Sequence, residues 1–105
     1  MIFQLTAPLL DGCVLAILEQ EDAYGYSLTQ QLKREIDISE STLYPVLRRL
    51  QKDGCLEVYD QECGGRNRRY YKITARGGEQ LADYRREWED YASKISLLFS
   101  GEESI

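Results

Sequence analysis

The 105-residue chain contains no histidine, only three cysteines and only two prolines. Histidine is the most frequent general base and a common zinc ligand, so its absence removes the side chain on which many active sites depend. No nucleophile–base pair and no phosphate loop of the Walker type can be assembled from the other residues, which argues against an enzyme. Cys13, Cys55 and Cys63 lack Cys-x-x-Cys spacing. We therefore expect free thiols, with no metal site, no disulfide framework and no cofactor.

Long apolar runs are also absent. No segment approaches the roughly 18 apolar residues of a membrane span, and the N-terminal residues lack the basic flank of a secretory peptide. We expect a cytoplasmic protein without a membrane partner. A chain of this length forms one domain with a modest core, so a second copy is a plausible source of further stability.

Positive charge is scarce overall but locally concentrated. The net charge is -5, from 13 basic and 18 acidic side chains. The balance is -4 over residues 1–39, +3 over residues 40–76 and -4 over residues 77–105. A nucleic-acid-binding surface would need such a local basic region, so the acidic total does not exclude DNA binding.

Apolar spacing predicts two helices in the first third of the chain. The first is expected from Thr6, as N-cap, to Glu19, with Pro8 in its first turn and an apolar stripe at helical intervals. The second is expected from Tyr24 to Ile36, where apolar residues recur every four positions.

A third helix is predicted before Gly54, with Leu43, Val46, Leu47 and Leu50 on one face. Proline is tolerated mainly in the first helical turn, so Pro45 favours Ser41 as the N-cap, although a kinked helix capped by Ser39 stays open. The short turn at residues 37–40 joins helices two and three as in a helix-turn-helix. The opposite face of the third helix carries hydroxyls and cations suited to DNA, namely Ser41, Thr42, Tyr44, Pro45, Arg48, Arg49 and Lys52.

A basic hairpin is predicted next. Strands are expected at residues 56–62 and 69–73, around a tip at residues 63–68. Gly64 and Gly65 permit a turn from which Arg66, Arg68 and Arg69 would project on a flexible loop toward a DNA backbone or minor groove. A loop that merely improves solubility is the alternative, but the placement of two glycines just before the arginines favours contact with a target.

The last helix is expected from Thr74 to about Ser100. Leu81, Tyr84, Trp88, Tyr91, Ile95 and Leu98 recur at alternating intervals of three and four. This narrow seam is typical of helices that pack lengthwise on a partner, so a homodimer is expected. The fold class is therefore α+β and mostly helical: a winged helix-turn-helix with a long C-terminal dimerisation helix.

Three segments, in this order and spacing, resemble the PadR family of bacterial transcriptional regulators. They are Ala23-Tyr-Gly-Tyr-Ser-Leu28, Ser41-Thr-Leu-Tyr-Pro-Val-Leu-Arg-Arg-Leu50 and Gly64-Gly-Arg-Asn-Arg-Arg-Tyr-Tyr-Lys-Ile-Thr74. The match covers nearly the whole chain, and the order and spacing of the three segments make them together far more specific than any one of them.

The resemblance implies a dimeric repressor in the bacterial cytoplasm that leaves its palindromic operator when an effector binds. It implies a DNA-binding domain at residues 1–76 and a single dimerisation helix with a tail at residues 77–105, as in the short subgroup. Ser41, Thr42, Tyr44 and Pro45 would face the operator, with Arg66 and Arg68 at the wing tip. Asn67 departs from the proline that many relatives carry in that tip.

Some relatives of the short subgroup respond to drugs and place a tryptophan at the position of Trp88, between the two protomers. By this resemblance Trp88, Tyr84, Tyr91 and Ile95 are candidates for dimer contact and for a small aromatic effector. Simple packing of Trp88 in the helix seam is slightly favoured over ligand binding. A winged-helix module that docks on an acidic protein, without binding DNA specifically, is the alternative function.

Overall fold

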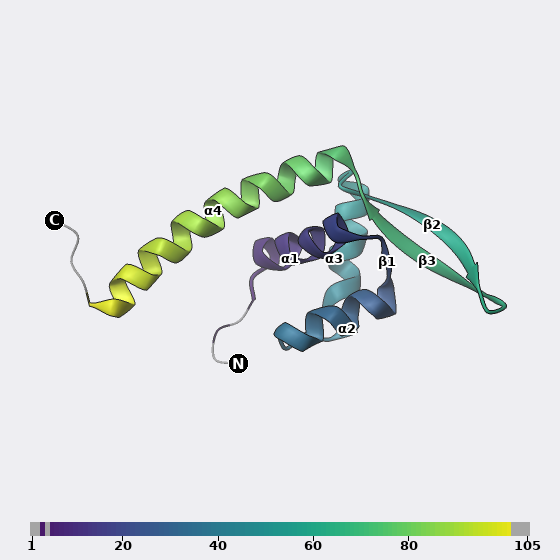
Figure 1. Cartoon of the computed structure of the whole chain (residues 1–105), viewed down its shortest axis with the longest axis horizontal. Helices are drawn as coiled ribbons and strands as arrows, with labels where there is room; N and C mark the ends of the chain where they lie inside the picture. Colours follow the sequence, from purple (N-terminus) through teal and green to yellow (C-terminus); the bar gives the residue numbers. More distant parts are fainter. Residues whose placement is uncertain (1–2, 4, 102–105) are drawn as a thin grey trace.

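The computed structural model describes residue 3 and residues 5–101, so parts of both expected units, residues 1, 2, 4 and 102–105, lie outside the described residues. Its elements are α1 (Ala7–Gln20), β1 (Ala23–Tyr24), α2 (Gly25–Glu35), α3 (Glu40–Lys52), β2 (Leu56–Cys63), β3 (Arg66–Ile73) and α4 (Ala75–Ser100). Three helices and a small antiparallel sheet form the body, and α4 extends away from it (Figure 1). The expected winged-helix fold is confirmed. Among the described helices, none is sufficiently long and apolar to cross a membrane.

Helix α1 lies at the centre of the core and follows Thr6, the expected N-cap position. Its buried face is formed by Leu10, Val14, Leu15 and Leu18, each at most 3% exposed. Helix α1 contacts α2, α3, α4 and β3, so its buried face links the other elements of the core. Removing its apolar surface from water is therefore a large part of what holds the elements together.

The start of α3 corrects the favoured prediction of Ser41 as N-cap. The helix begins at Glu40 with Ser39 as its cap residue, and the Ser39 carbonyl accepts hydrogen bonds from Thr42 N and Leu43 N, both at 3.1 Å. Pro45 consequently lies in the second turn, where it cannot donate to the carbonyl of Ser41. Because Ser41 is exposed, water can replace that one lost donor, which makes the proline tolerable here.

Strand β1 was missed by the sequence prediction, which placed Tyr24 in the second helix. Ala23 and Tyr24 instead pair antiparallel with β3, opposite Tyr71 and Tyr70 respectively, and α2 starts at Gly25. A strand of two residues is too short to show the alternation by which strands are detected, so only its pairing with β3 defines it.

The hairpin is tighter than predicted. Strand β2 pairs with β3 along its whole length, from Leu56 opposite Ile73 to Cys63 opposite Arg66. Gly64 and Gly65 alone form the turn, with φ of 58° and 82°. A two-residue turn of this kind needs positive φ at both positions, and a glycine pair meets that need without strain. The three arginines are therefore residues of β3, held in a sheet, and the predicted flexible six-residue tip is wrong.

Helix α4 begins after Thr74, whose hydroxyl accepts a hydrogen bond from Gly77 N at 3.1 Å, as expected of an N-cap. Its first half packs on α1 and its second half runs beyond the body (Figure 1). The residues of the predicted α4 seam therefore fall into two groups, one packed on the chain's own core and one beyond the body. Leu81 is 2% exposed and belongs to the core of its own chain, and Tyr84 packs against that core. Heptad spacing cannot distinguish contacts within a chain from contacts with a partner, which explains the difference.

Two adjacent glycines in the first turns of α4 predict opposite effects of the same substitution. A methyl group on Gly77 would lie 2.3 Å from the Cys55 carbonyl oxygen, whereas one on Gly78 would meet nothing within 4 Å. We expect Gly77→Ala to destabilise the protein by about 1–3 kcal/mol, because the α4 backbone must move away from Cys55. Gly78→Ala should add up to about 1 kcal/mol through helix propensity. Urea unfolding at matched protein concentration measures both, and equal midpoints would contradict this packing.

Candidate nucleic-acid interface

The outer face of α3 presents Ser41, Tyr44, Arg48 and Lys52, which follow one another at intervals of three and four residues. Such intervals place side chains on one face of a helix. Ser41, Arg48 and Lys52 are exposed, whereas Tyr44 is half-buried. The buried face carries the four apolar residues predicted for the core, all at most 5% exposed. Helix α3 thus separates a packing face from a hydroxyl- and cation-bearing face.

Three hydroxyls gather where α3 begins. Ser39 Oγ lies 2.9 Å from Ser41 Oγ and 3.1 Å from Thr42 Oγ1, within hydrogen-bond distance of both. All three residues are exposed, as is Pro45 in the following turn. Hydroxyls near a helix N-terminus can donate to phosphate oxygens, and the helix dipole favours negative charge there. Ser39, which the sequence suggested only as a cap, is therefore an additional member of this surface.

Arg49 takes a different direction from Arg48. Its guanidinium donates to Asp11 Oδ1 on α1, and the two form an ion pair. Asp11 is 6% exposed and also accepts a hydrogen bond from the Tyr84 hydroxyl at 3.4 Å. Burial raises the pKa of the Asp11 carboxyl above its ordinary value, against the opposing effect of the Arg49 charge. Arg49 thus pairs with a buried carboxylate, although its own side chain remains 41% exposed at the edge of the outer face.

Asp11 is a residue that the sequence prediction missed. It lies among the apolar positions of α1, three, four and seven residues before Val14, Leu15 and Leu18. An acidic side chain on that stripe must be buried, and a buried carboxylate needs a cation or several donors. Its position on the apolar face was therefore the observable signal, although its partner could not be identified without the fold.

A cleft of about 440 Å³ joins α3 to the wing. Its lining includes Tyr44 of α3, Arg68 and Arg69 of β3, and the first residues of α2. The Tyr44 ring packs close to Gly25, where an added methyl would lie 2.9 Å from the Tyr44 hydroxyl. A glycine at the start of α2 thus allows the tyrosine to sit between the two elements. The cleft brings predicted contact residues from two parts of the chain onto one surface.

The three wing arginines differ in their surroundings. Arg66 is exposed beside the turn, at the end of the hairpin far from α3. The Arg68 guanidinium carbon lies 4.5 Å from the centre of the Tyr24 ring, a cation–π contact. Arg69 Nε lies 3.5 Å from Asp60 Oδ1 across the strands, but both side chains are more than half exposed. An exposed pair of this kind is weak, so Arg69 remains available to a phosphate.

Tyrosines form a continuous aromatic surface on the sheet that the sequence prediction did not recognise. Tyr59 and Tyr70 stack with ring centres 5.5 Å apart, Tyr70 lies 5.7 Å from Tyr24, and Tyr24 lies 6.4 Å from Tyr26. The Tyr59 hydroxyl donates to Asp22 at 2.7 Å, and this hydrogen bond is the main reason that the pKa of Tyr59 rises to about 12. The contacts tie β1 to the wing and hold Arg68 in place.

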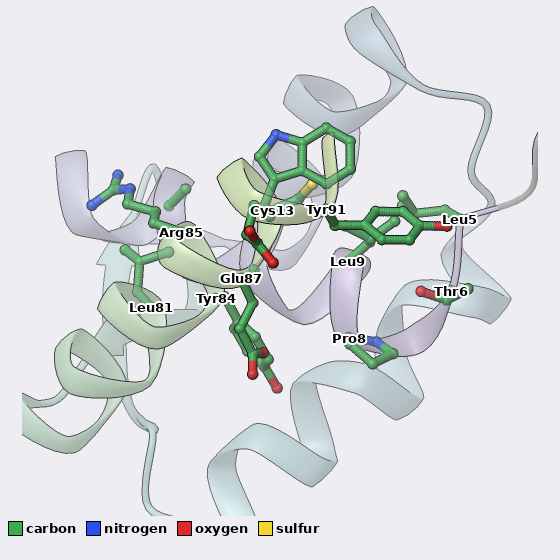
Figure 2. A pocket seen from close by; sticks show the side chains of 14 residues that line it. Leu5, Thr6, Pro8, Leu9, Cys13, Leu81, Tyr84, Arg85, Glu87 and Tyr91 are labelled. Carbon is green, nitrogen blue, oxygen red and sulfur yellow. The ribbon is translucent and has the colours of Figure 1, made fainter. Parts of the chain in front are cut away.

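The other predicted group lies on α4, far from the hairpin. Trp88 and Tyr91 are 49% and 58% exposed, with ring centres 6.3 Å apart, whereas Tyr84 and Ile95 are partly buried. Trp88, Tyr84 and Tyr91 line a groove of about 800 Å³ between α1 and α4, together with residues such as Leu5 and Leu9 (Figure 2).

Acidic side chains complete the rim of this groove. Glu87 and Asp90 both line it, whereas the guanidinium of Arg85 is paired with Glu19 of α1 at 3.1 Å. Asp90 is paired with Lys94, with Nζ 3.0 Å from Oδ2, whereas Glu87 adds negative charge beside the aromatic rings, which favours a flat cation over an anion. Within the described part of the chain, no three acidic or cysteine side chains meet in a group that could hold a metal ion.

A model of the PadR-like family of transcriptional regulators matches residues 14–83, which cover α2, α3 and the wing. This chain belongs to that family. It is 39% identical over 75 residues to Transcriptional regulator Rv3488 of Mycobacterium tuberculosis, covering 70% of each chain. The solved structure of smu.1704 from Streptococcus mutans is similar with a TM-score of 0.90 and 38% identity, covering 100% of this chain and 99% of the other.

A PadR-like transcriptional regulator from Bacillus cereus is similar with a TM-score of 0.83 and 36% identity, covering 90% of this chain and 94% of that one. PadR-family regulators bind DNA and are typically dimeric. The family resemblance inferred from three sequence segments is confirmed. Regulation of transcription, rather than catalysis, is the general role of the family.

Adjacent arginines on α3 predict different effects of the same substitution on the stability of the protein. Arg49→Met leaves the buried Asp11 carboxylate without its cation, which should destabilise the protein by roughly 1–3 kcal/mol. Arg48→Met, at an exposed position in the next place along the helix, should change stability by less than about 0.5 kcal/mol. Urea denaturation of both variants measures the difference. A destabilisation by Arg48→Met as large as that by Arg49→Met would contradict the assignment of Arg49 to Asp11.

Proposed function

We propose that this PadR-family regulator is a homodimeric, sequence-specific repressor that leaves a palindromic operator when an effector binds. The observation that supports this proposal most strongly is the cleft lined by Tyr44 of α3 and by Arg68 and Arg69 of β3. Through it the recognition helix and the wing form one surface, so both can contact the same DNA duplex.

In this proposal α3 reads the major groove. Ser41, Thr42 and Tyr44 face base edges or phosphates, Pro45 shapes the start of the surface, and Arg48 and Lys52 supply positive charge. Arg66, Arg68 and Arg69 grip the flanking backbone from the wing, which is a sequence-independent and salt-sensitive contribution. Arg49 has a supporting role, since its guanidinium pairs with Asp11.

The second half of α4 supports dimerisation. Trp88, Tyr91, Leu98 and Phe99 are between 49% and 76% exposed, a large apolar surface for one helix. Contiguous apolar surface of this size favours contact with another protein surface. A second α4 packed along it would bury these side chains and fix the separation of the two recognition helices. Residues 1–76 would then be the DNA-binding unit, with the dimer helix following them.

The groove between α1 and α4 is our candidate effector site. Its volume of about 800 Å³ lies in the range of small-molecule pockets, and its lining joins Trp88 and Tyr91 to Glu87 and Asp90. These groups suit a flat aromatic cation. Such a ligand would act by preferring a dimer geometry in which the recognition helices have the wrong separation, because equal affinity for both geometries shifts nothing.

Docking on an acidic protein surface is the second candidate function. The same exposed cations on α3 and β3 would serve it, and the net charge of -5 is unusual for a DNA-binding protein. The two candidate functions predict different DNA affinities in a titration. A repressor prefers its operator over random DNA, whereas a docking module requires no preference for any DNA sequence.

The first test compares a duplex from the region upstream of the protein's own gene with a random duplex of equal length. We expect the upstream duplex to bind at least about 10³-fold more tightly at physiological salt, which fluorescence anisotropy measures. The double variant Arg66→Ala/Arg68→Ala should bind both duplexes more weakly and show a shallower dependence of affinity on salt. Equal affinity of the parent protein for both duplexes would favour docking. An unchanged salt slope in the variant would refute the role given to the wing.

The second test concerns the groove and uses rhodamine 6G, a flat aromatic cation, as probe. We expect it to quench the fluorescence of Trp88, the single tryptophan of the chain. In calorimetry, binding should survive Trp88→Phe, which retains an aromatic face, and be lost in Trp88→Ala. Sedimentation of each variant separates loss of the ligand site from loss of the dimer. Undiminished binding by a dimeric Trp88→Ala protein would contradict the site.

A further inference from the structure

One buried carboxylate contacts the helices that carry both proposed surfaces. Asp11 of α1 uses its two oxygens separately: Oδ1 accepts from Arg49 of α3, and Oδ2 accepts from the Tyr84 hydroxyl of α4 at 3.4 Å. Asp11 is 6% exposed, so water has little access to replace either donor. Three helices therefore meet at a single acidic side chain.

The two donors belong to different functional regions. Arg49 follows Arg48, which lies on the outer face of the recognition helix, so the position of the Arg49 guanidinium is linked to the orientation of α3. Tyr84 lines the groove between α1 and α4, one helical turn before Trp88. Figure 2 shows the Tyr84 side chain among those that surround the groove. Asp11 itself does not line the groove, so it lies between the two regions.

We propose that Asp11 is a positioning residue that couples occupancy of the groove to the orientation of α3, through the Tyr84 hydroxyl on one side and the Arg49 guanidinium on the other. This inference rests on the proposed function, in which the groove takes a ligand that lowers affinity for DNA. The inference adds the residues through which a ligand in the groove would lower the affinity of α3 for DNA.

The physical basis is the cost of leaving a buried carboxylate short of donors. At 3.4 Å the bond from Tyr84 is long, so a small shift of α4 or of the tyrosine ring by a ligand is enough to break it. Arg49 is then the only donor to Asp11 among the described residues. Its guanidinium must shift to donate to both carboxylate oxygens, and this shift is passed to α3 through the Arg49 side chain. Coupling of this kind is reciprocal: bound DNA must weaken the ligand by the factor by which the ligand weakens DNA.

The test uses two substitutions that each remove one hydroxyl from α4. Tyr84→Phe removes the donor to Asp11 and retains the ring, while Ser93→Ala is the matched control, because the exposed Ser93 hydroxyl donates to the Glu89 carbonyl of the same helix at 2.8 Å and Ser93 does not line the groove. For each dimer, the dissociation constant of the upstream duplex is measured with and without saturating rhodamine 6G. The ratio of the two constants is the coupling factor.

We expect a coupling factor of about 5–150 for the parent protein and for Ser93→Ala. In Tyr84→Phe the factor should fall toward one, while rhodamine 6G still quenches Trp88 and DNA still binds without ligand. Asp11→Asn should give the same loss of coupling, and it serves as the second variant if Tyr84→Phe is unstable.

The possible results distinguish failure of the Asp11 coupling from failure of the proposed repressor function. A full coupling factor in folded Tyr84→Phe and Asp11→Asn proteins overturns the role of Asp11 and leaves the repressor and its effector site intact. A parent protein that binds DNA but shows no quenching, or no change of DNA affinity with rhodamine 6G, overturns the effector site and the coupling together. Equal loss of coupling in Ser93→Ala would also overturn the inference, because the effect would then follow from any change on α4.

Discussion

Burial of one face of α1 is the constraint on which the rest of the structure depends. With its four buried apolar residues, α1 contacts α3, β3 and α4 at once, so the relative positions of these elements depend on a single helix. The same face contains Asp11, whose carboxylate bonds to α3 and α4. A packed interior that includes the Asp11–Arg49 ion pair thus joins α1 to both α3 and α4.

The elements were predictable where periodicity extends over several turns. Leu43, Val46, Leu47 and Leu50 define the buried face of α3, and the seam of α4 is equally regular. The errors lie where long-range pairing decides. Strand β1 exists only because β3 lies beside it, and Arg66, Arg68 and Arg69 belong to β3 because the glycine pair closes the turn in two residues. The start of α3 at Glu40, after the N-cap residue Ser39, depends on a proline being tolerated in the second turn.

The candidate site was predictable in its outer residues and hidden in its supporting ones. Hydroxyls and cations opposite an apolar stripe can be read from helical spacing, which placed Tyr44 and Arg48 on α3. Spacing could not show that Arg49 pairs with Asp11, 38 residues earlier, nor that Tyr24 supports Arg68. The net charge of -5 is similarly misleading, because folding gathers the basic middle third of the chain on α3 and the wing.

The central claim is that two copies of this chain present their recognition helices at a separation set by α4. Selection of bound sequences from a random pool of duplex DNA tests it most directly, because one experiment reports sequence preference and spacing together. The account predicts an inverted repeat whose half-sites lie about one helical turn apart, or a multiple of it. Recovery of no preferred sequence, or of a single unrepeated site, would contradict it.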